Sequence, residues 1–470
     1  MDHSSDKFAA TGFLFLQPKN IGFFELFRVY FGTTKLHKEN FVQCNEVVEE
    51  ESLDEYKSLV FVSLLLQKLM LLFKYPLKYL GFTIELFFNL ASGNCNIFQI
   101  ISNLLQGKEL VDTNSADYVS IIGHLDNRVE LDKRIQRDDP KYNVALSMMT
   151  SKAAYENQAF IRDTVENHWK MEVVASGDYW NDFEGEATTQ AYVLLNKSDN
   201  HDTYIVTFRG TEFFDADQWS CDFDISWLEL PSLGKTHAGF MKALGLQKSN
   251  MGWPKEIDKN NHGHAPEAYY FIRDLLKKHL DGNDKAKFIV TGHSLGGALA
   301  ILFPAILILH EETFLLERLE GVYTFGQPRV GGDIFSKYME KNLKENGVMF
   351  YRIVYSYDIV PRLPPDYKDI LFRHFGTCLY YDRNYNCKKM QEEPNKNYFS
   401  LSEIIPMSLN AFCELIRSFF MVSRYGSEYQ EGWLLRIFRL VGLVIPGASN
   451  HIPQDYVNAT RLGSIPSKMD

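Results

Sequence analysis

Two kinds of hydrophobic pattern alternate along the chain from about residue 143 onward. Short runs rich in β-branched and aromatic residues predict buried strands at 188–195, 203–208, 287–291, 321–325 and 349–355. Longer runs before and between them predict helices at 145–157, 265–280 and 297–310. Because strands that alternate with helices form a mostly parallel sheet covered on both faces, the pattern predicts an α/β fold with helices flanking a central sheet.

A different pattern, apolar on almost every side, occupies 56–92. If this stretch is helical, its few polar residues lie along one narrow edge: Ser63, Gln67, Lys74 and Lys78. Pro76 predicts a break, because proline removes a helix hydrogen bond and clashes with the preceding turn, so two shorter helices are expected. No run of about 18 apolar residues occurs, so an ordinary membrane-spanning helix is not expected.

The local charge of the same stretch points toward lipid. Residues 56–92 contain four lysines and one glutamate, a local charge of +3 in a chain whose net charge is −11. Apolar area beside positive charge is typical of helices that rest on an anionic lipid surface. A helical hairpin buried against the main domain is the alternative, and the sequence leaves both open.

These patterns divide the chain into three parts. Residues 1–110 form an N-terminal region that holds the hydrophobic helices, the polar residues 111–142 predict a linker, and residues 143–470 form the main domain. A second apolar stretch at about 404–445 predicts a helical insert, either on lipid or packed on the domain core. Two arginines in this insert are compatible with a phospholipid surface: Arg436 and Arg439.

Composition and charge exclude several classes of protein. The chain has 49 Lys and Arg against 60 Asp and Glu, which argues against a dedicated nucleic-acid-binding protein. Its six cysteines show neither a CxxC pair nor the Cys/His spacing of a zinc site, so free thiols and no metal are expected. The N-terminus lacks the basic and apolar segments of a secretory signal, which predicts a protein on the cytosolic side of its membranes.

The clearest chemical motif follows the strand predicted at 287–291. Gly292-His293-Ser294-Leu295-Gly296 is a GxSxG sequence, and an apolar helix follows it directly. A serine on a tight turn between strand and helix projects its Oγ into the open, and glycines at positions −2 and +2 avoid a collision across that turn. This context predicts that Ser294 is a nucleophile on a nucleophile elbow formed with Gly292, His293 and Gly296.

A nucleophilic serine needs an orienting carboxylate, and Asp358 is the favoured candidate. It follows the strand predicted at 349–355, so it lies at the carboxyl end of a strand, where α/β sheets place functional residues. In this type of fold the acid follows the serine along the chain and precedes the histidine. Two other carboxylates, Asp333 and Asp366, lie in loop-like stretches and are interpreted as solvated.

Three histidines follow the serine and could serve as the general base. His451 lies in a late loop between a predicted helix and the C-terminal tail, and it is the favoured candidate. His374 lies in an aromatic run sixteen residues after Asp358 and is interpreted as structural, with a catalytic role left open. His310 ends the helix that follows the nucleophile and is interpreted as a helix-terminal residue.

At these residues the chain resembles the class 3, fungal-type lipases, which have an α/β-hydrolase fold, and more closely the plant oil-body triacylglycerol lipases. The matching pieces lie at 206–211, 236–240, 292–297, 324–330, 357–364 and 451–458. The closer plant resemblance adds 122–129 and 461–463. The consistent order of these pieces over about 260 residues makes coincidence remote.

The resemblance implies a role for each matching residue. Ser294, Asp358 and His451 would form the catalytic triad, and Thr211 with the backbone N–H of Leu295 would form the oxyanion hole. The family's lid would correspond to residues 212–222, with three aromatic lid candidates: Phe213, Phe214 and Trp219. Core packing is the alternative for these aromatic residues. His237 matches a family element and is interpreted as structural.

The resemblance also implies a function: a serine lipase that hydrolyses stored acylglycerols at the lipid-droplet surface and needs no metal or cofactor. A phospholipase or galactolipase A1 that acts on membrane lipids would share the same triad. An inactive lipase-like signalling scaffold would share the fold alone. The sequence does not predict an oligomeric state.

Overall fold

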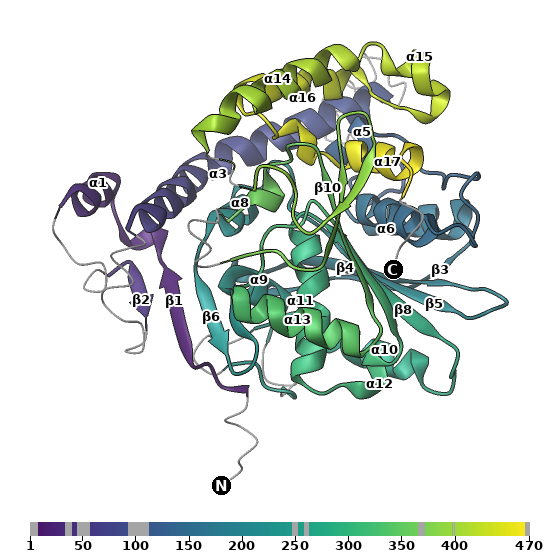
Figure 1. The fold of residues 1–470 in the computed structure, drawn as a ribbon, viewed down its shortest axis with the longest axis horizontal. Helices are drawn as coiled ribbons and strands as arrows, with labels where there is room; N and C mark the ends of the chain where they lie inside the picture. Colours follow the sequence, from purple (N-terminus) through teal and green to yellow (C-terminus); the bar gives the residue numbers. More distant parts are fainter. Residues whose placement is uncertain are drawn as a thin grey trace, which may run out of the picture.

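The computed structural model describes residues 8–32, 40–44, 57–92, 112–246, 252–257, 263–364, 372–396, 398 and 400–465, with the side chains of 401, 422 and 427 left aside. A central sheet of eight strands crosses the molecule (Figure 1). The strands are β3 (Glu172–Asn181), β4 (Glu186–Asn196), β5 (Thr203–Phe208), β8 (Lys287–His293), β9 (Leu319–Phe325), β10 (Met349–Tyr355), β11 (Thr377–Tyr381) and β12 (Cys387–Met390).

The order of these strands is β12-β11-β10-β9-β8-β5-β4-β3. The five strands from β11 to β5 pair in parallel, while β12, β4 and β3 join at the edges in antiparallel fashion. The predicted mostly parallel sheet flanked by helices is therefore confirmed. The carboxyl ends of β5, β8 and β10 lie at the same edge of this sheet, which is where the candidate site lies.

Helices cover both faces of the sheet, and each face has its own hydrophobic core. The helices α10 (Ala268–Leu280), α11 (Leu295–Leu309) and α13 (Asp333–Glu345) pack in one core. The helices α6 (Tyr142–Ala153) and α17 (Pro453–Leu462) pack in the other. Neighbouring residues of β8, Ile289 and Val290, enter different cores because successive strand side chains point to opposite faces.

A second sheet joins the N-terminal region to the main domain. Its strands β2 (Val42–Cys44), β1 (Gly12–Leu16), β6 (Trp227–Leu230) and β7 (Gly234–His237) are all antiparallel. Gly12 lies opposite Glu229, and Leu14 lies opposite Trp227. The N-terminal region expected at 1–110 therefore contributes two strands, β1 and β2, to a sheet that also contains residues of the main domain.

The apolar stretch at 56–92 is one continuous helix, α3 (Lys57–Ser92), and Pro76 lies inside it. The prediction of two helices was wrong, because contacts on both sides of the proline fix the course of the helix. Lys74 pairs with Asp217 two residues before the proline, and Gly81 lies against Phe214 five residues after it. Tertiary packing of this kind supplies most of the stability of helices in proteins.

In α3 the polar side faces the protein and the apolar side is exposed, which is the opposite of the usual arrangement in a helix at a protein surface. Its polar edge faces the protein, where Ser63 Oγ donates to the carbonyl of Phe223 at 2.8 Å and Gln67 donates to Asp224 at 3.3 Å. Its apolar side is exposed at Leu72, Phe73, Tyr75, Tyr79, Leu80, Phe82 and Phe87. By length and composition, α3 is the one described helix that could cross a membrane, which was not expected because the sequence contains no run of about 18 apolar residues.

The insert expected at about 404–445 is helical and contains α14 (Leu401–Arg417), α15 (Met421–Tyr425) and α16 (Trp433–Val444). These helices lie along the same side of the molecule as α3 (Figure 1). Their outer side exposes Ile404, Ile405, Leu409, Phe412, Ile416, Trp433, Ile437, Leu440, Val441 and Val444. Arg439 is buried and bonded to three carboxylates, so the expectation that it faces phospholipid is wrong.

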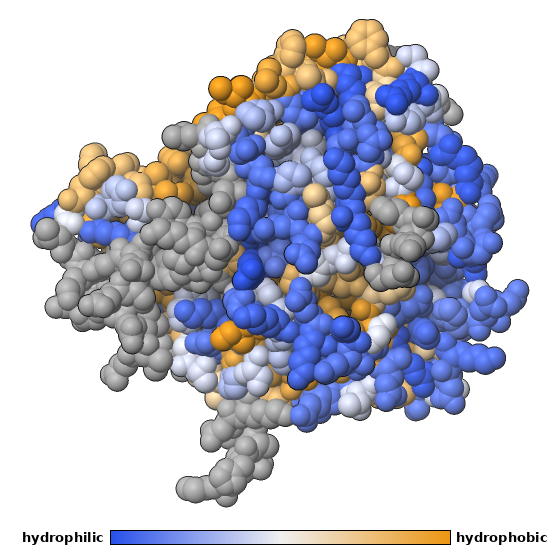
Figure 2. Space-filling model, in the orientation of Figure 1, coloured by the Kyte–Doolittle hydropathy of each residue, from blue (hydrophilic) through white to orange (hydrophobic). Residues whose placement is uncertain are grey.

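Exposed apolar side chains of these helices gather at the surface. Figure 2 shows hydrophobic residues along the upper edge, over α14, and at the left, over α1 (Phe23–Phe31). In α1, Phe24 is 94% exposed and Phe31 is 78% exposed. Contiguous exposed apolar surface of this kind marks contact with a membrane or a partner rather than with water.

The polar stretch expected as a linker at 111–142 is packed against the main domain. It contains the short helix α5 (Ile121–Leu125), followed by the buried residues Asp126 and Arg128. The guanidinium of Arg128 donates to Asn458 of α17 at 2.7 Å and to Asp126 at 2.6 Å. Asp126 and Arg128, within the stretch expected as a linker, are therefore ion-pair and hydrogen-bond partners inside the fold.

Candidate active site

The candidate nucleophile Ser294 lies on a strained turn between β8 and α11. Its backbone angles are φ 60° and ψ −131°, a conformation that costs energy for any residue with a Cβ. A Cβ on Gly292 would lie 2.2 Å from Gly296, and a Cβ on Gly296 would lie 2.2 Å from the carbonyl oxygen of Phe208. Both flanking glycines are therefore required by the close approach of backbone segments.

Three side chains from distant parts of the chain meet at this turn. His451 follows α16 in a short 3-10 helix, η7 (Ser449–His451), and its Nε2 accepts the hydroxyl proton of Ser294 at an O–N distance of 2.7 Å. The Nδ1 of His451 donates to Asp358, at 2.8 Å to Oδ2 and 3.0 Å to Oδ1. Asp358 lies just after β10, as the sequence pattern predicted. The geometry is that of a nucleophile, a general base and an orienting acid.

Two further groups hold the carboxylate of Asp358. The hydroxyl of Tyr456 donates to Oδ2 at 2.5 Å, and the backbone N–H of Val360 donates to Oδ1 at 2.9 Å. Tyr456 lies five residues after His451, in the first half of α17. Sequence reasoning missed it, because nothing in the local pattern shows that this face of α17 turns toward the end of β10.

His293 of the elbow packs directly on the candidate base. Its ring stacks on that of His451 with centroids 4.6 Å apart, and its Nδ1 lies 2.7 Å from the hydroxyl of Tyr155. Burial, together with the nearby imidazole of His451, holds the pKa of His293 well below its ordinary value. His293 therefore stays neutral at physiological pH and supports the position of His451 without adding a charge.

The candidate oxyanion residues lie on either side of Ser294. A Cβ on Gly210 would lie 3.0 Å from the Cβ of Ser294, so the chain segment that carries Thr211 passes next to the nucleophile. Leu295 is the first residue of α11, and N–H groups in the first turn of a helix have no acceptor within the helix. Backbone N–H groups of this kind can stabilise a developing negative charge.

The hydroxyl of Thr211 is held by a buried carboxyl group. Its Oγ1 lies 3.1 Å from Oδ2 of Asp222, which belongs to α8 (Ala216–Phe223). Burial raises the pKa of Asp222 to about 7, although His451 and Thr211 act in the opposite direction. Asp222 was not singled out from the sequence, where an acidic residue in a polar stretch has no distinguishing signal.

The segment that contains the aromatic lid candidates covers the site. The rings of Trp219 and His451 lie 6.3 Å apart, and those of Phe213 and Phe438 of α16 lie 4.7 Å apart. Phe214 packs against Gly81 of α3. Ser294 is 1% exposed beneath this cover. The segment is thus held between α3, α16 and the candidate base.

The other candidate residues lie in different surroundings. His310 bonds the carbonyl of Trp253 and the hydroxyl of Tyr269, His374 bonds the carbonyl of Pro361, and His237 caps α9 (Ala238–Leu244). Burial lowers the pKa of each of these three histidines. Asp333 pairs with Arg373 and Lys337 at the surface, and Asp366 lies outside the described residues.

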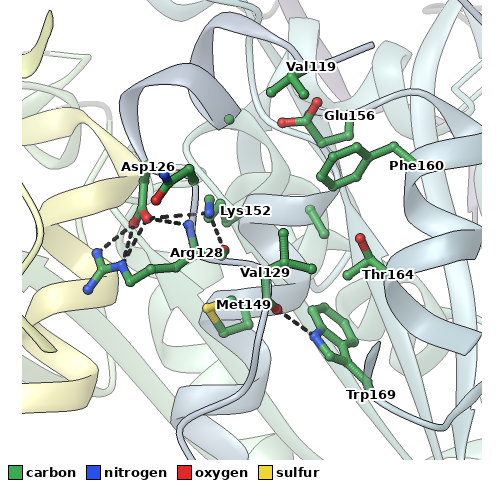
Figure 3. Close-up of a pocket in the computed structure, with 13 residues that line it drawn as sticks. Val119, Asp126, Arg128, Val129, Met149, Lys152, Glu156, Phe160, Thr164 and Trp169 are labelled. Carbon is green, nitrogen blue, oxygen red and sulfur yellow. Dashed lines mark hydrogen bonds and ion pairs between the residues drawn. The ribbon is translucent and has the colours of Figure 1, made fainter. Parts of the chain in front are cut away.

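Within the described ranges, no group of three or more His, Cys, Asp or Glu side chains is placed to hold a metal ion. A cavity of about 110 Å³ lies beside Met149, Lys152 and Trp169 (Figure 3), and no member of the Ser294–His451–Asp358 set lines it. Lys152 at this cavity is bonded to the carbonyl of Arg128 at 2.6 Å, so its ammonium group already has a partner.

Comparison with known proteins shows which family the chain is similar to. The class 3 lipase family matches residues 205–368. Triacylglycerol lipase OBL1 of Nicotiana tabacum is 41% identical over 87% of this chain and 84% of its own length, and triacylglycerol lipase OBL1 of Arabidopsis thaliana is 38% identical over 96% and 95%. A solved Rhizomucor miehei triacylglyceride lipase aligns with 56% of this chain and 88% of its own, at 23% identity and a TM-score of 0.39. The predicted resemblance is confirmed by the plant relatives, and the protein belongs to the class 3 lipase family.

Proposed function

We propose that this protein is a triacylglycerol lipase that hydrolyses the ester bonds of stored acylglycerols through Ser294, His451 and Asp358. The observation that carries the proposal is the continuous hydrogen-bonded chain from Ser294 through His451 to Asp358. Plant relatives that bear the name triacylglycerol lipase support the choice of substrate. The reaction needs no group beyond those of the chain and a water molecule.

In the first step, His451 Nε2 takes the proton of Ser294 as the serine oxygen attacks the acyl carbonyl carbon. Asp358 holds the imidazole in the tautomer whose Nε2 is free to accept that proton, and it stabilises the imidazolium that forms. The imidazolium then protonates the alkoxide of the leaving glyceride as the ester bond breaks. Water, deprotonated by the same imidazole, releases the fatty acid and restores the serine.

The negative charge of each tetrahedral intermediate would be stabilised by Thr211 and by the N–H of Leu295. Removal of one such donor costs on the order of a hundredfold to a thousandfold in kcat in enzymes of this kind. The contact between Thr211 and Asp222 would fix the orientation of the threonine side chain.

The segment 212–222 would act as the lid of this site. It covers Ser294, and its aromatic side chains lie over the candidate base and against α3 and α16. An acylglycerol reaches Ser294 only if this segment moves away. Lids of this kind exclude water from the reaction until substrate is present.

The exposed apolar sides of α1, α3, α14 and α16 would rest on the surface of a lipid droplet, from the cytosolic side. Most of the lysines that suggested an electrostatic contact are used within the protein: Lys57 bonds the carbonyl of Gly32, Lys68 that of Pro18, and Lys74 the carboxylate of Asp217. Apolar area rather than positive charge is therefore the main contribution proposed for this contact.

The experiment that tests the proposed function combines covalent labelling with two lipid substrates. The wild-type protein and a Ser294→Ala variant would be treated with a fluorophosphonate probe, and fatty acid release would be measured on triolein emulsion and on phosphatidylcholine vesicles. We expect labelling of the wild type only, and faster release from triolein. A wild type that is folded but not labelled would contradict a serine-based mechanism, and preference for the vesicles would favour a phospholipase.

A further inference from the structure

The inner sides of the insert helices α14 and α16 carry a buried cluster of charges. Glu414 of α14 and Arg439 of α16 are both about 1% exposed or less, and the two side chains lie 3.2 Å apart. Arg439 also bonds Glu431, and it donates to Asp455 of α17 at 3.0 Å. Charges this deep are expensive to desolvate, and well-packed apolar residues often hold helices together at least as well. Stability alone therefore does not account for the cluster.

Glu414 lies at the centre of this cluster and accepts hydrogen bonds from four side chains. The donors are Asn450 at 2.6 Å, Asn410 at 3.1 Å, Arg439 at 3.2 Å and Tyr355 at 3.4 Å. These donors come from the loop before α17, from α14, from α16 and from β10. One carboxylate thus connects four elements that are far apart in the sequence.

Two of these contacts lead directly to the candidate triad. Asn450 is the residue immediately before His451. Asn410 also donates to the Oγ of Ser356 at 3.0 Å, and Ser356 lies two residues before Asp358 with a left-handed φ of 46°. The backbone turns that present the candidate base and the candidate acid are therefore both tied to Glu414.

A third contact reaches the same place from α17. Arg439, which bonds Glu414, also holds Asp455, and the next residue, Tyr456, donates its hydroxyl to Asp358. His451 and Tyr456 are thus each separated from Glu414 or its arginine by one intermediate residue, and Asp358 is linked to Glu414 through Asn410 and the turn that begins at Ser356.

We propose that Glu414 is a positioning residue for catalysis, which fixes the turns carrying His451 and Asp358 relative to each other through Asn450 and Asn410. The proposal rests on the proposed triad. Asp358 and His451 are 93 residues apart, and the insert helices α14 to α16 take up about half of that interval, so the backbone between them does not hold them in register. The insert helices then have two faces with different tasks, an outer apolar side and an inner side that aligns the triad.

The test uses three variants and two matched controls. Asn450→Ala removes the contact nearest to His451, Glu414→Ala removes the centre of the cluster, and Glu414→Gln keeps an acceptor oxygen while it removes the charge. Glu312→Ala removes another buried carboxylate, which pairs with Lys277 near the far end of α11, about 22 Å along the helix from Ser294. Asn196→Ala removes a buried amide at the end of β4, where it bonds Arg137.

The readouts are kcat and KM on a water-soluble p-nitrophenyl ester, the rate of fluorophosphonate labelling, and the midpoint of thermal unfolding. We expect Asn450→Ala to lower kcat and the labelling rate on the order of tenfold to a hundredfold with KM unchanged, because small misplacements of reacting groups cost that much. For position 414 we expect wild type, then Gln, then Ala in order of decreasing kcat. The controls should lower the unfolding midpoint and leave kcat unchanged.

Each outcome bears on one proposal. If Asn450→Ala and both variants at 414 unfold at lower temperature but keep the wild-type kcat and labelling rate, the insert cluster is structural and the positioning role is refuted. If Glu414→Ala does not fold, Asn450→Ala and Glu414→Gln decide the question. If the wild type itself is not labelled, or Ser294→Ala is labelled equally, it is the proposed triad that fails.

Discussion

A Gly81→Ala substitution should loosen the proposed lid while it leaves the catalytic groups untouched. Gly81 lies in the second half of α3, directly against the proposed lid segment. A Cβ at this position would lie 2.7, 2.8 and 2.9 Å from three atoms of Phe214, distances that real Cβ atoms essentially never show. Either the helix or the lid segment must shift. The helix is held by Gln67 bonded to Asp224 and by Lys68 bonded to carbonyls at 18 and 21, so the lid segment is expected to move.

The size of the effect follows from this clash. Overpacking of a tight contact by one carbon typically costs about 1–3 kcal/mol. The gain in helix propensity from Gly to Ala, about 1 kcal/mol, applies equally whether the lid is closed or open and therefore cancels. If the clash raises the free energy of the closed state alone, the open population rises roughly fivefold to a hundredfold, at about 1.4 kcal/mol per factor of ten.

The assay is the rate at which a small water-soluble fluorophosphonate labels Ser294 in the absence of lipid. The same measurement with a triolein emulsion provides an internal control, because the lid is then open in both proteins and the rates should converge. A labelling rate of the Gly81→Ala protein equal to that of the wild type without lipid would show that the contact between α3 and Phe214 does not restrain access. A rise that is equally large with lipid would place the effect outside the lid.

Four further predictions concern the site and the surface. Thr211→Val should lower kcat on the order of a hundredfold with KM unchanged, because it removes a hydroxyl beside the developing oxyanion. An unchanged kcat would show that this hydroxyl does not stabilise the oxyanion. Tyr456→Phe should lower kcat by a smaller factor, on the order of tenfold. Asp358 keeps its hydrogen bond from the N–H of Val360 but loses the one from the tyrosine hydroxyl, which is worth about 1–2 kcal/mol. Pre-steady-state acylation rates would measure the loss. Burial under the closed lid raises the pKa of Asp222 from 3.8 to about 7. Because the closed state therefore holds this proton more tightly than the open state, the closed lid is favoured below pH 4 and loses this advantage as the pH rises to 7. The ratio of lipid-free to lipid-activated labelling rates should therefore rise between pH 5 and pH 8, and Asp222→Asn should abolish that rise. Paired Phe73→Asp and Phe82→Asp substitutions on the exposed side of α3 should weaken flotation with lipid droplets, without change in hydrolysis of a soluble ester.

The chemistry of the site was accessible to sequence reasoning because it depends on local context. Ser294 sits between a β-branched strand and an apolar helix, and Asp358 follows a strand directly, so both positions could be predicted from neighbouring residues. The central sheet could be predicted for the same reason. His451 was harder to predict, since both His374 and His451 follow Asp358 along the chain, and only the aromatic surroundings of His374 and the family resemblance favour His451.

The groups that hold these residues had no such local signal. Tyr155, Asp222, Glu414 and Tyr456 each lie more than 70 residues from Ser294 along the chain. Their partners near the site are fixed only by the packing of whole helices. The direction in which α3 faces was also hidden. A helical wheel shows a polar edge, but it does not show whether that edge turns to water or to polar groups of the protein such as Asp224.

The pairing of β1 with β6 has a practical consequence for anyone who wants a freely dispersed form of this enzyme. When an enzyme is attached to lipid by a separate terminal segment, deletion of that segment leaves the folded enzyme intact in solution. Here, shortening the chain from its beginning removes β1 from a sheet whose other half leads into α9, and it also removes the carbonyl groups of Gly32 and Pro18 that Lys57 and Lys68 of α3 bond. Solubility is better improved by substitutions of the exposed apolar side chains than by truncation, because the elements proposed to contact lipid are also part of the fold that holds the active site.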